Sequence, residues 1–407
     1  MSGLSLSVFR RCLFLCFIGL AAALPSASQA QTLAIHDDIR TFATLTNTAV
    51  TLTGRSELRI TGTPDPLVGC VVHLNSPDSM LLLAGIVPST TASTFLGRVR
   101  VDGAVATAGG NVRVVQYANG TAVIPHSPDF APLEVFDGRF FTGSSRILSQ
   151  YTAYNNALLG DMAAAISSFK LKRGYMATFA TNEAGTGFSR NYVAQDGDLE
   201  ISLLPATMEN AVRFVRVFPW RWVSKKGIAG NIAAPVKAMW WYNWNLDQNS
   251  PLDREYVAIR HTRYWPGLGQ NWQTRGVNHL LGYNEPDHVD QANMTVAEAI
   301  SSWPDLLGTG LRVGSPAPTD GGLSWLYSFM TDAATASLRV DFVAVHYYTA
   351  TATHRTRRAR RRSFTTSSKA STTRPASPSG SRNGTTAQIG RAAPTRPLRS
   401  NKPRSQP

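Results

Sequence analysis

The pattern of apolar and polar positions divides the chain into two parts. Up to about residue 168, short runs alternate apolar with polar residues and are separated by turn residues, a pattern typical of β-strands with one buried face. The clearest runs are residues 49–53, 58–61, 71–74, 81–83, 99–101 and 112–115. Helical periodicity is scarce before residues 155–169. Residues 31–168 are therefore predicted to form an all-β accessory domain, either a sandwich or a short β-solenoid.

From residue 169 onward, apolar strands alternate with helical segments. Strands are expected at residues 175–180, 239–244, 256–260, 279–283, 311–314 and 340–347, and helices at residues 295–307 and 323–333. Strands separated by helices of this length predict parallel βαβ units. Residues 169–348 are therefore predicted to be of the α/β class and to form the first six strands of a (β/α)8 TIM-type barrel that is incomplete at its C-terminal end.

A carboxylate stands where one of these strands ends. The apolar run at residues 279–283 is followed by Asn284, Glu285 and Pro286. Proline has no N–H to continue a strand ladder, so the strand opens into a loop at this point. In a barrel of parallel strands the active site lies at the carboxyl ends, where a half-desolvated carboxyl group can hold a proton for donation. Glu285 is a candidate general acid, although a loop carboxylate that caps the next helix gives the same local pattern.

Tryptophan is confined to the second part of the chain. All nine tryptophans lie between Trp220 and Trp325, with the densest run at residues 240–244. Aromatic faces stack on pyranose rings, so this clustering favours a sugar-binding cleft. Side chains alternate along a strand, so a core position is equally compatible with any one ring. Trp303 and Trp325, inside helical segments, are assigned to the core.

Several motifs then occur in one order. They are Trp-Trp-Tyr-Asn-Trp at residues 240–244, Gly-Tyr-Asn-Glu-Pro-Asp at 282–287, Gln-Ala-Asn-Met-Thr-Val at 291–296, Gly-Ser-Pro-Ala at 314–317 and Val-Asp-Phe-Val-Ala-Val-His-Tyr-Tyr at 340–348. Together they resemble the Asl-type glycosyl hydrolase catalytic core, which is similar to glycoside hydrolase family 128, a family of β-1,3-glucanases. The resemblance implies a retaining mechanism with Glu285 as general acid/base. It also implies a second glutamate on strand seven as nucleophile, about 5 Å away.

The same resemblance directs attention to residues around Glu285. Asn284 is expected to donate a hydrogen bond to the sugar 2-OH. The other candidates for substrate contact are Trp241, Asn243, Trp244, His346 and Tyr347. No metal-ligand spacing and no phosphate-binding glycine loop occurs, so neither a metal nor another cofactor is predicted.

The second glutamate is missing from the sequence. No Glu follows Glu298 and no Asp follows Asp341. Residues 349–407 instead form a basic, low-complexity tail, which is predicted to be disordered. We interpret the tail as the product of a shifted reading frame, because another frame over residues 363–390 permits a helix, a Gly-Lys-Pro turn and an apolar strand that ends in Glu. As written, the chain is predicted to be weakly active or inactive.

The net charge of +14 comes from the same tail. Residues 354–407 contain 14 Lys plus Arg and no acidic residue, so the remainder is balanced, with 26 residues of each sign. We therefore expect no nucleic-acid partner, although a basic arm that binds an anionic polymer is a weaker alternative.

Residues 1–30 have the pattern of a secretory signal peptide. Two arginines precede an apolar run at residues 12–24, which is short for a membrane span, and a small-residue cleavage pattern follows. We predict a secreted or periplasmic monomer without a membrane partner. Its predicted function is to hydrolyse a β-glucan polysaccharide, most simply β-1,3-linked, by double displacement. A carbohydrate-binding protein without catalysis is the alternative, and its sugar affinity would be insensitive to Glu285→Gln.

Overall fold

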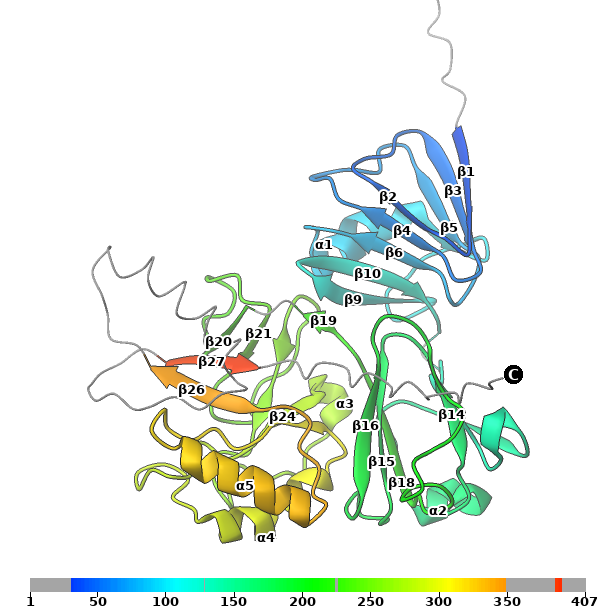
Figure 1. Cartoon of the computed structure of the whole chain (residues 1–407). Coiled ribbons are helices and arrows are strands. Elements are labelled where there is room, and N and C mark those ends of the chain that lie inside the picture. The colour runs from blue at the N-terminus through cyan, green and yellow to red at the C-terminus, as the bar shows by residue number, and fades with distance from the viewer. Residues whose placement is uncertain (1–30, 128, 224–225, 349–384, 390–407) are drawn as a thin grey trace, which may run out of the picture.

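The computed structural model describes residues 31–127, 129–223, 226–348 and 385–389. Three units follow one another along the chain (Figure 1): a first β unit at residues 31–125, a second β unit at residues 133–219 and an α/β unit from residue 220 onward. The predicted signal peptide and most of the predicted tail lie outside the described residues.

The first β unit consists of two sheets between which the chain passes back and forth. Its strands are β1 (Gln31–His36), β2 (Ile39–Phe42), β3 (Thr48–Thr53), β4 (Glu57–Ile60), β5 (Val71–Leu74), β6 (Met80–Leu83), β7 (Val99–Val101), β8 (Ala104–Val105), β9 (Val112–Ala118) and β10 (Gly120–Pro125). One sheet has the order β1-β3-β5-β7-β8, and the other includes β9-β10-β6-β4-β2. The neighbours from β1 to β7 and from β2 to β6 are parallel, as in a short β-solenoid.

Alternation explains why this unit was predictable. In β3 the residues Thr48, Val50 and Leu52 are buried while their neighbours are half-exposed, and the buried side chains meet those of the facing sheet in one core. Cys70 is buried in the same core. The helix α1 (Pro88–Thr90) follows β6, and Ser89 donates from its N–H and Oγ to Asp253 of the α/β unit, at 2.8 and 2.7 Å.

The second β unit contains two antiparallel sheets of four strands each. Its elements are β11 (Leu133–Phe136), β12 (Ser145–Leu148), β13 (Ala153–Tyr154), α2 (Asn156–Leu159), β14 (Ser168–Leu171), β15 (Tyr175–Ala180), β16 (Ser189–Ala194), β17 (Leu199–Ile201) and β18 (Phe214–Pro219). The sheet orders are β12-β11-β14-β17 and β13-β18-β15-β16. These sheets share a core of their own.

The structure corrects the prediction that a parallel barrel starts at residue 169. The strand at residues 175–180 exists, but β15 pairs antiparallel with both β16 and β18. All six residues of β15 are buried, because one face lies on the core of this unit and the other on a core that is shared with the first β unit and the α/β unit. A continuous apolar run is typical of any strand that is buried on both faces, so the run alone does not indicate parallel pairing.

The α/β unit contains the strands and helices that were predicted after residue 239. Its elements are β19 (Trp222–Val223), β20 (Gly227–Ala229), β21 (Trp240–Tyr242), β22 (Glu255–Tyr256), β23 (Ala258–Ile259), α3 (Trp272–Arg275), β24 (His279–Leu281), α4 (Val296–Leu307), β25 (Arg312–Val313), α5 (Leu323–Thr335) and β26 (Ala344–Tyr348). β20-β21-β22 and β23-β24-β25 are parallel, and a parallel bridge joins Gly314 to Phe342 ahead of β26.

Mixed α/β content is confirmed, but a closed barrel is not formed by the residues that the structure describes. In a (β/α)8 barrel a helix follows each strand. Within the described part of this unit, α3 is the first helix, and the connections between β20, β21 and β22 contain turns and bends instead.

The strands of the α/β unit separate two cores. Trp241, Tyr256 and Leu280 belong to a large outer core that also includes residues of both β units, of α3 and of α4 and α5, two helices that lie together below the strands in Figure 1. Trp240, Tyr242 and Leu281 face the opposite, inner side. The helix α4 starts with a capping box in which Thr295 and Glu298 bond each other's backbone N–H groups.

Five residues of the predicted tail are described. Thr385–Ile389 form β27, which pairs antiparallel with β26. The prediction that the tail does not fold is therefore wrong for these five residues, whose two threonines and one isoleucine favour strand conformation. The reading-frame interpretation concerns residues that lie otherwise outside the described ranges.

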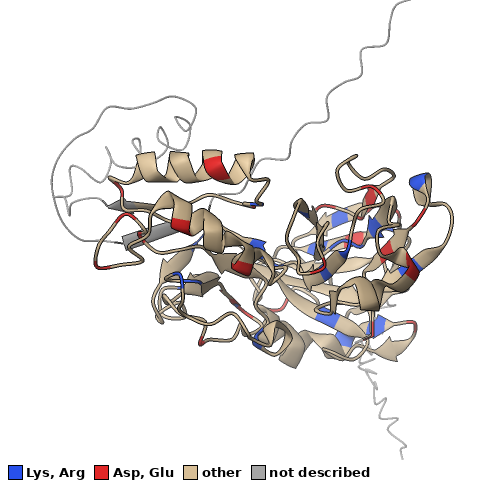
Figure 2. Cartoon of the chain, turned by 90° about the horizontal axis from the view of Figure 1, so that it is seen from below, with Lys and Arg blue, Asp and Glu red and all other residues tan. Residues whose placement is uncertain are grey.

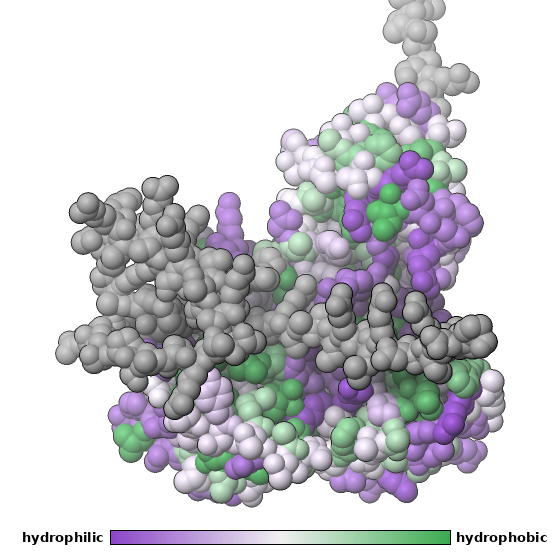
Figure 3. Space-filling model, in the orientation of Figure 1, coloured by the Kyte–Doolittle hydropathy of each residue, from purple (hydrophilic) through white to green (hydrophobic). Residues whose placement is uncertain are grey.

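The molecular surface is mixed in charge and hydropathy. Figure 2 shows Lys and Arg intermingled with Asp and Glu over the two β units, and fewer of either sign on the α/β unit. On the face seen in Figure 3, hydrophobic residues form separate small groups among hydrophilic ones. Among the described helices, none is long and apolar enough to cross a membrane.

Candidate active site

Glu285 lies just beyond the carboxyl end of β24. The strand direction continues through a parallel bridge between Asn284 and Ala317, and the Glu285 N–H donates to the Ala317 carbonyl at 2.8 Å. Glu285 has a φ of +40°, although it precedes Pro286, where an extended conformation is favoured. A non-glycine residue held in this sparsely populated region has a conformational cost, and such residues concentrate at functional sites.

The carboxyl group of Glu285 contacts His346 on β26. Glu285 Oε1 lies 2.9 Å from His346 Nδ1, and only 13% and 5% of their side chains are exposed. The contact joins residues that are 61 positions apart in the chain. The contact holds the carboxyl group of Glu285 in a defined orientation.

A small, open hollow lies beside this pair. Its lining residues are Trp240, Tyr242, Ile259, Leu281, Gly282, Asn284, Ala317, Ala344, Val345 and His346. They belong to or directly follow the parallel strands and β26, so the hollow is on the inner side of the strands. Apolar walls with a few convergent polar groups are typical of a ligand site.

Three buried polar atoms around Glu285 have no hydrogen-bond partner among the described residues. They are Tyr242 Oη, Asn284 Oδ1 and His261 Nδ1. Burial, together with the charge of Glu285, raises the pKa of Tyr242 to about 12. Burial also lowers the pKa of His261, whose carbonyl accepts from the Asn284 N–H at 2.9 Å. Buried polar groups are almost always paired, so this concentration indicates a place where a polar ligand supplies the partners.

The predicted site residues are only partly brought together. Asn284 and His346 line the hollow, and His346 contacts Glu285, which is not itself one of the lining residues. Trp241 does not line the hollow: its side chain is 8% exposed and lies in the outer core, 5.3 Å from the ring of Tyr256. This prediction is corrected by strand alternation, because Trp240 and Tyr242 take the inner face of β21 and leave Trp241 to the outer one.

Asn243 and Trp244 follow β21 in the loop beyond its carboxyl end. The Asn243 side chain donates to Asp247 at 2.7 Å and accepts from the Tyr256 hydroxyl, so it holds the loop together. The Trp244 ring is half-buried and lies edge-on to Tyr242 at 5.3 Å. Tyr347 belongs to β26, but its side chain lies outside the described atoms.

Trp240, Tyr242 and His261 were not predicted as substrate contacts. The first two stand in the Trp-Trp-Tyr-Asn-Trp motif, one position from residues that were predicted. The sequence signal for them is the alternation along β21, which becomes useful only when the face directed toward Glu285 is known.

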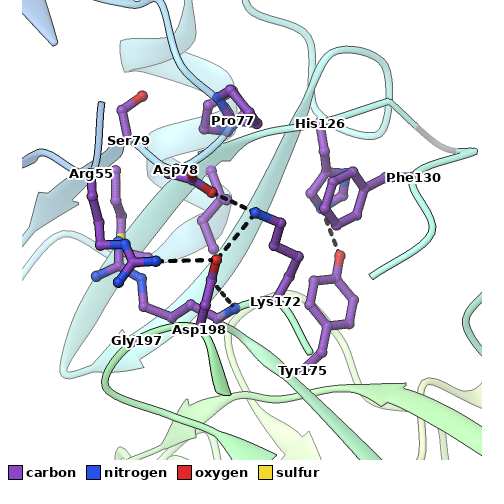
Figure 4. Close-up of a pocket in the computed structure, with 14 residues that line it drawn as sticks. Arg55, Pro77, Asp78, Ser79, His126, Phe130, Lys172, Tyr175, Gly197 and Asp198 are labelled. Atoms are coloured by element: carbon purple, nitrogen blue, oxygen red, sulfur yellow. Dashed lines mark hydrogen bonds and ion pairs between the residues drawn. The ribbon is translucent and has the colours of Figure 1, made fainter. Parts of the chain in front are cut away.

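A second small hollow lies where the two β units meet (Figure 4). Lys172 donates to Asp78 at 2.9 Å and to Asp198 at 3.1 Å, and Tyr175 Oη lies 2.9 Å from His126 Nε2. The polar groups labelled there are thus largely paired with one another, which indicates a structural junction. In the described part of the chain, no group of three or more His, Cys, Asp or Glu is placed to hold a metal ion.

Comparison with protein families adds an independent observation. Residues 219–361 match a family model described as glycosyl hydrolase catalytic core. This segment resembles a glycosyl hydrolase. The match contains β24, Glu285 and His346, and it confirms the resemblance inferred from the motifs.

The solved structures that are similar to parts of this chain include a glucanase and a βγ-crystallin domain. An endo-β-1,3-glucanase of glycoside hydrolase family 128, subgroup I, from Amycolatopsis mediterranei in complex with laminaritriose is 30% identical, with a TM-score of 0.30. The match covers 35% of this chain and 63% of that chain, so the present chain spans less than two thirds of the glucanase. A βγ-crystallin domain from Flavobacterium johnsoniae is 26% identical over 21% of this chain and 93% of that chain, with a TM-score of 0.19. No curated protein matched the chain.

Proposed function

We propose that the α/β unit is the catalytic part of a β-glucan hydrolase, with Glu285 as general acid/base and the hollow beside it as the sugar site. The observation that carries this proposal is the position of Glu285: at a strand end, paired with His346, and next to a hollow with buried unpartnered polar atoms. In this proposal the strands from β20 to β26 are successive strands of a (β/α)8 barrel, and the protein is exported.

A sugar is the ligand class that suits these groups. Tyr242 Oη can donate or accept, while Asn284 Oδ1 accepts only, so the ligand must present both donors and acceptors. Hydroxyl groups do this, and the aromatic walls from Trp240 and Tyr242 suit the apolar face of a pyranose. The β-1,3 linkage follows the family resemblance and is the linkage to test first.

The proposed mechanism needs a second carboxylate. A retaining enzyme places its nucleophile about 5 Å from the acid/base, and an inverting enzyme places its base about 6.5–9.5 Å away. Among the described residues, no Asp or Glu lines the hollow, and Glu285 lies next to it through its contact with His346. In this proposal Glu285 protonates the leaving-group oxygen. Because the second carboxylate is lacking, turnover of this chain is expected to be weak or absent.

The lack of a second carboxylate at this hollow is also compatible with a second function. A hollow that has a proton donor but lacks a nucleophile could bind β-glucan without cleaving it. Sugar binding would then survive Glu285→Gln, since glutamine has the shape of glutamate and retains an acceptor oxygen toward His346.

The two functions are separated by measuring hydrolysis and binding on the same samples. Laminarin would be incubated with the full chain and with Glu285→Gln, and new reducing ends and bound oligosaccharide would be measured. Asp290→Asn, an exposed carboxylate in the same loop, is the matched control. Hydrolysis that disappears only in Glu285→Gln supports the hydrolase. Binding without hydrolysis in all three supports the binding protein, and the absence of both rejects the proposal.

A further inference from the structure

Among the described side chains of the α/β unit, those of three tyrosines are almost completely buried, and one of the three differs from the other two. Tyr256 Oη lies within hydrogen-bond distance of Asn243 Oδ1 and of the Asn245 carbonyl, either of which can accept its proton, and Tyr283 Oη lies 2.7 Å from Ser302 Oγ. Tyr242, which is 1% exposed, has no partner for its hydroxyl among the described residues. Within the described part of the α/β unit, the hydroxyls of Tyr256 and Tyr283 are thus paired, whereas that of Tyr242 is not.

The unpaired hydroxyl is unfavourable for the stability of the protein. A buried hydroxyl without a partner loses its hydrogen bonds to water and gains none in return. Phenylalanine would fill the same space without that loss, since Tyr242 packs through its ring on Trp244 and lines the hollow with Trp240. A group that costs stability and faces a hollow beside a candidate acid is explained by a ligand.

The position of Tyr242 indicates which kind of ligand. Its hydroxyl lies near the carboxyl group of Glu285, whose negative charge disfavours an anion in this space. Asn284 Oδ1, the neighbouring unpartnered atom, can only accept. A neutral polyol satisfies both groups, because one of its hydroxyls can accept from Tyr242 while another donates to Asn284.

We propose that Tyr242 is a substrate-binding residue whose hydroxyl bonds a hydroxyl group of the pyranose held next to Glu285, and so selects for a fully hydroxylated sugar. This inference rests on the proposed function of the site and adds a residue that no motif argument had assigned. A site built to bond a hydroxyl discriminates strongly against an analogue that lacks it, because the buried protein group is then left unpaired.

The test is the substitution Tyr242→Phe in the full chain. Laminaritriose would be titrated into each variant by calorimetry, and denaturant unfolding would be measured on the same samples. Tyr242→Phe is expected to weaken laminaritriose binding about tenfold or more while leaving stability equal or higher. A structural tyrosine would lose stability instead, which is the expectation for Tyr256→Phe.

Tyr192→Phe is the matched control. Its hydroxyl is also buried without a partner, but it belongs to the second β unit. This substitution should leave stability equal or higher without changing laminaritriose affinity. Unchanged affinity in Tyr242→Phe, or a loss of affinity together with stability, overturns the inference while the proposed function stands if the unaltered chain binds. If the unaltered chain does not bind laminaritriose, both are overturned.

Discussion

A buried cluster of charged residues lies at the amino ends of the strands, and it leads to a specific prediction for the stability of the protein. Glu255 begins β22 and is 2% exposed, and its Oε1 lies 3.1 Å from Nδ1 of His279, which begins β24. Burial alone would raise the pKa of Glu255, but His279, Arg221 and Arg312 together lower it. The carboxylate is therefore held ionised inside the protein by three neighbouring groups.

Replacing Glu255 with glutamine removes this charge and preserves the shape. The Glu255 carboxyl group and the His279 ring lie 3.1 Å apart, and the guanidinium groups of Arg221 and Arg312 add further attraction to the carboxylate. Glutamine retains an acceptor for His279, so part of that interaction survives. Removing one partner of a buried ion pair leaves the other charges uncompensated and typically costs about 3–5 kcal/mol. We expect a loss near the lower value for Glu255→Gln at pH 7.

The pH dependence of the unfolding free energy is a second measure of the same interaction. Because the pKa of Glu255 is lower in the folded protein, the stabilisation is present above the unfolded value of about 4.3 and is lost as pH falls below it. The difference between wild type and Glu255→Gln should therefore be large at pH 7 and shrink below about pH 4.

Urea unfolding at several pH values measures both effects. Glu209→Gln is the control, since Glu209 pairs with the largely exposed guanidinium of Arg139, and no measurable loss is expected. A loss below about 1 kcal/mol for Glu255→Gln at pH 7, or a difference that is independent of pH, would refute this account of the cluster.

Three further predictions follow from individual contacts. Thr295→Ala removes the side-chain acceptor of the capping box with Glu298 and should destabilise the protein by about 1 kcal/mol in urea unfolding. Trp303→Ala should cost about 3–5 kcal/mol in the same assay, because the Trp303 ring is fully buried and its Nε1 donates to a backbone carbonyl. Burial lowers the pKa of His126 to about 4. The stability of the protein should therefore be highest above the unfolded pKa of about 6.5 and should decrease as the pH falls from there to about 4. His126→Gln should reduce this decrease, and an unchanged dependence of stability on pH would contradict the prediction.

The elements of the fold were predictable where one face of a strand or helix is buried. Residues 48–53 alternate in burial, and α4 carries a capping signal at its start, so local patterns located both elements. Pairing direction was not predictable for β15, whose residues are buried on both faces by two different cores. The alternation that distinguishes one face from another is absent from such a run.

The site shows the same division. Glu285 was identified because a proline ends its strand, and His346 because it stands at the end of another strand in a motif of known order. Trp241 was predicted in place of Tyr242. The side of β21 that is directed toward Glu285 is set by packing between distant strands, and the sequence of β21 does not specify it. A shift of one residue along a strand exchanges the side chains that face the core with those that face the site.

The most direct test of the central claim is a crystal structure of the Glu285→Gln variant soaked with laminaritriose. The account predicts a sugar ring in the hollow between Trp240 and His346, with one of its hydroxyls about 3 Å from Tyr242 Oη. Laminaritriose bound elsewhere, such as at the junction of the two β units, with this hollow unchanged, would contradict it.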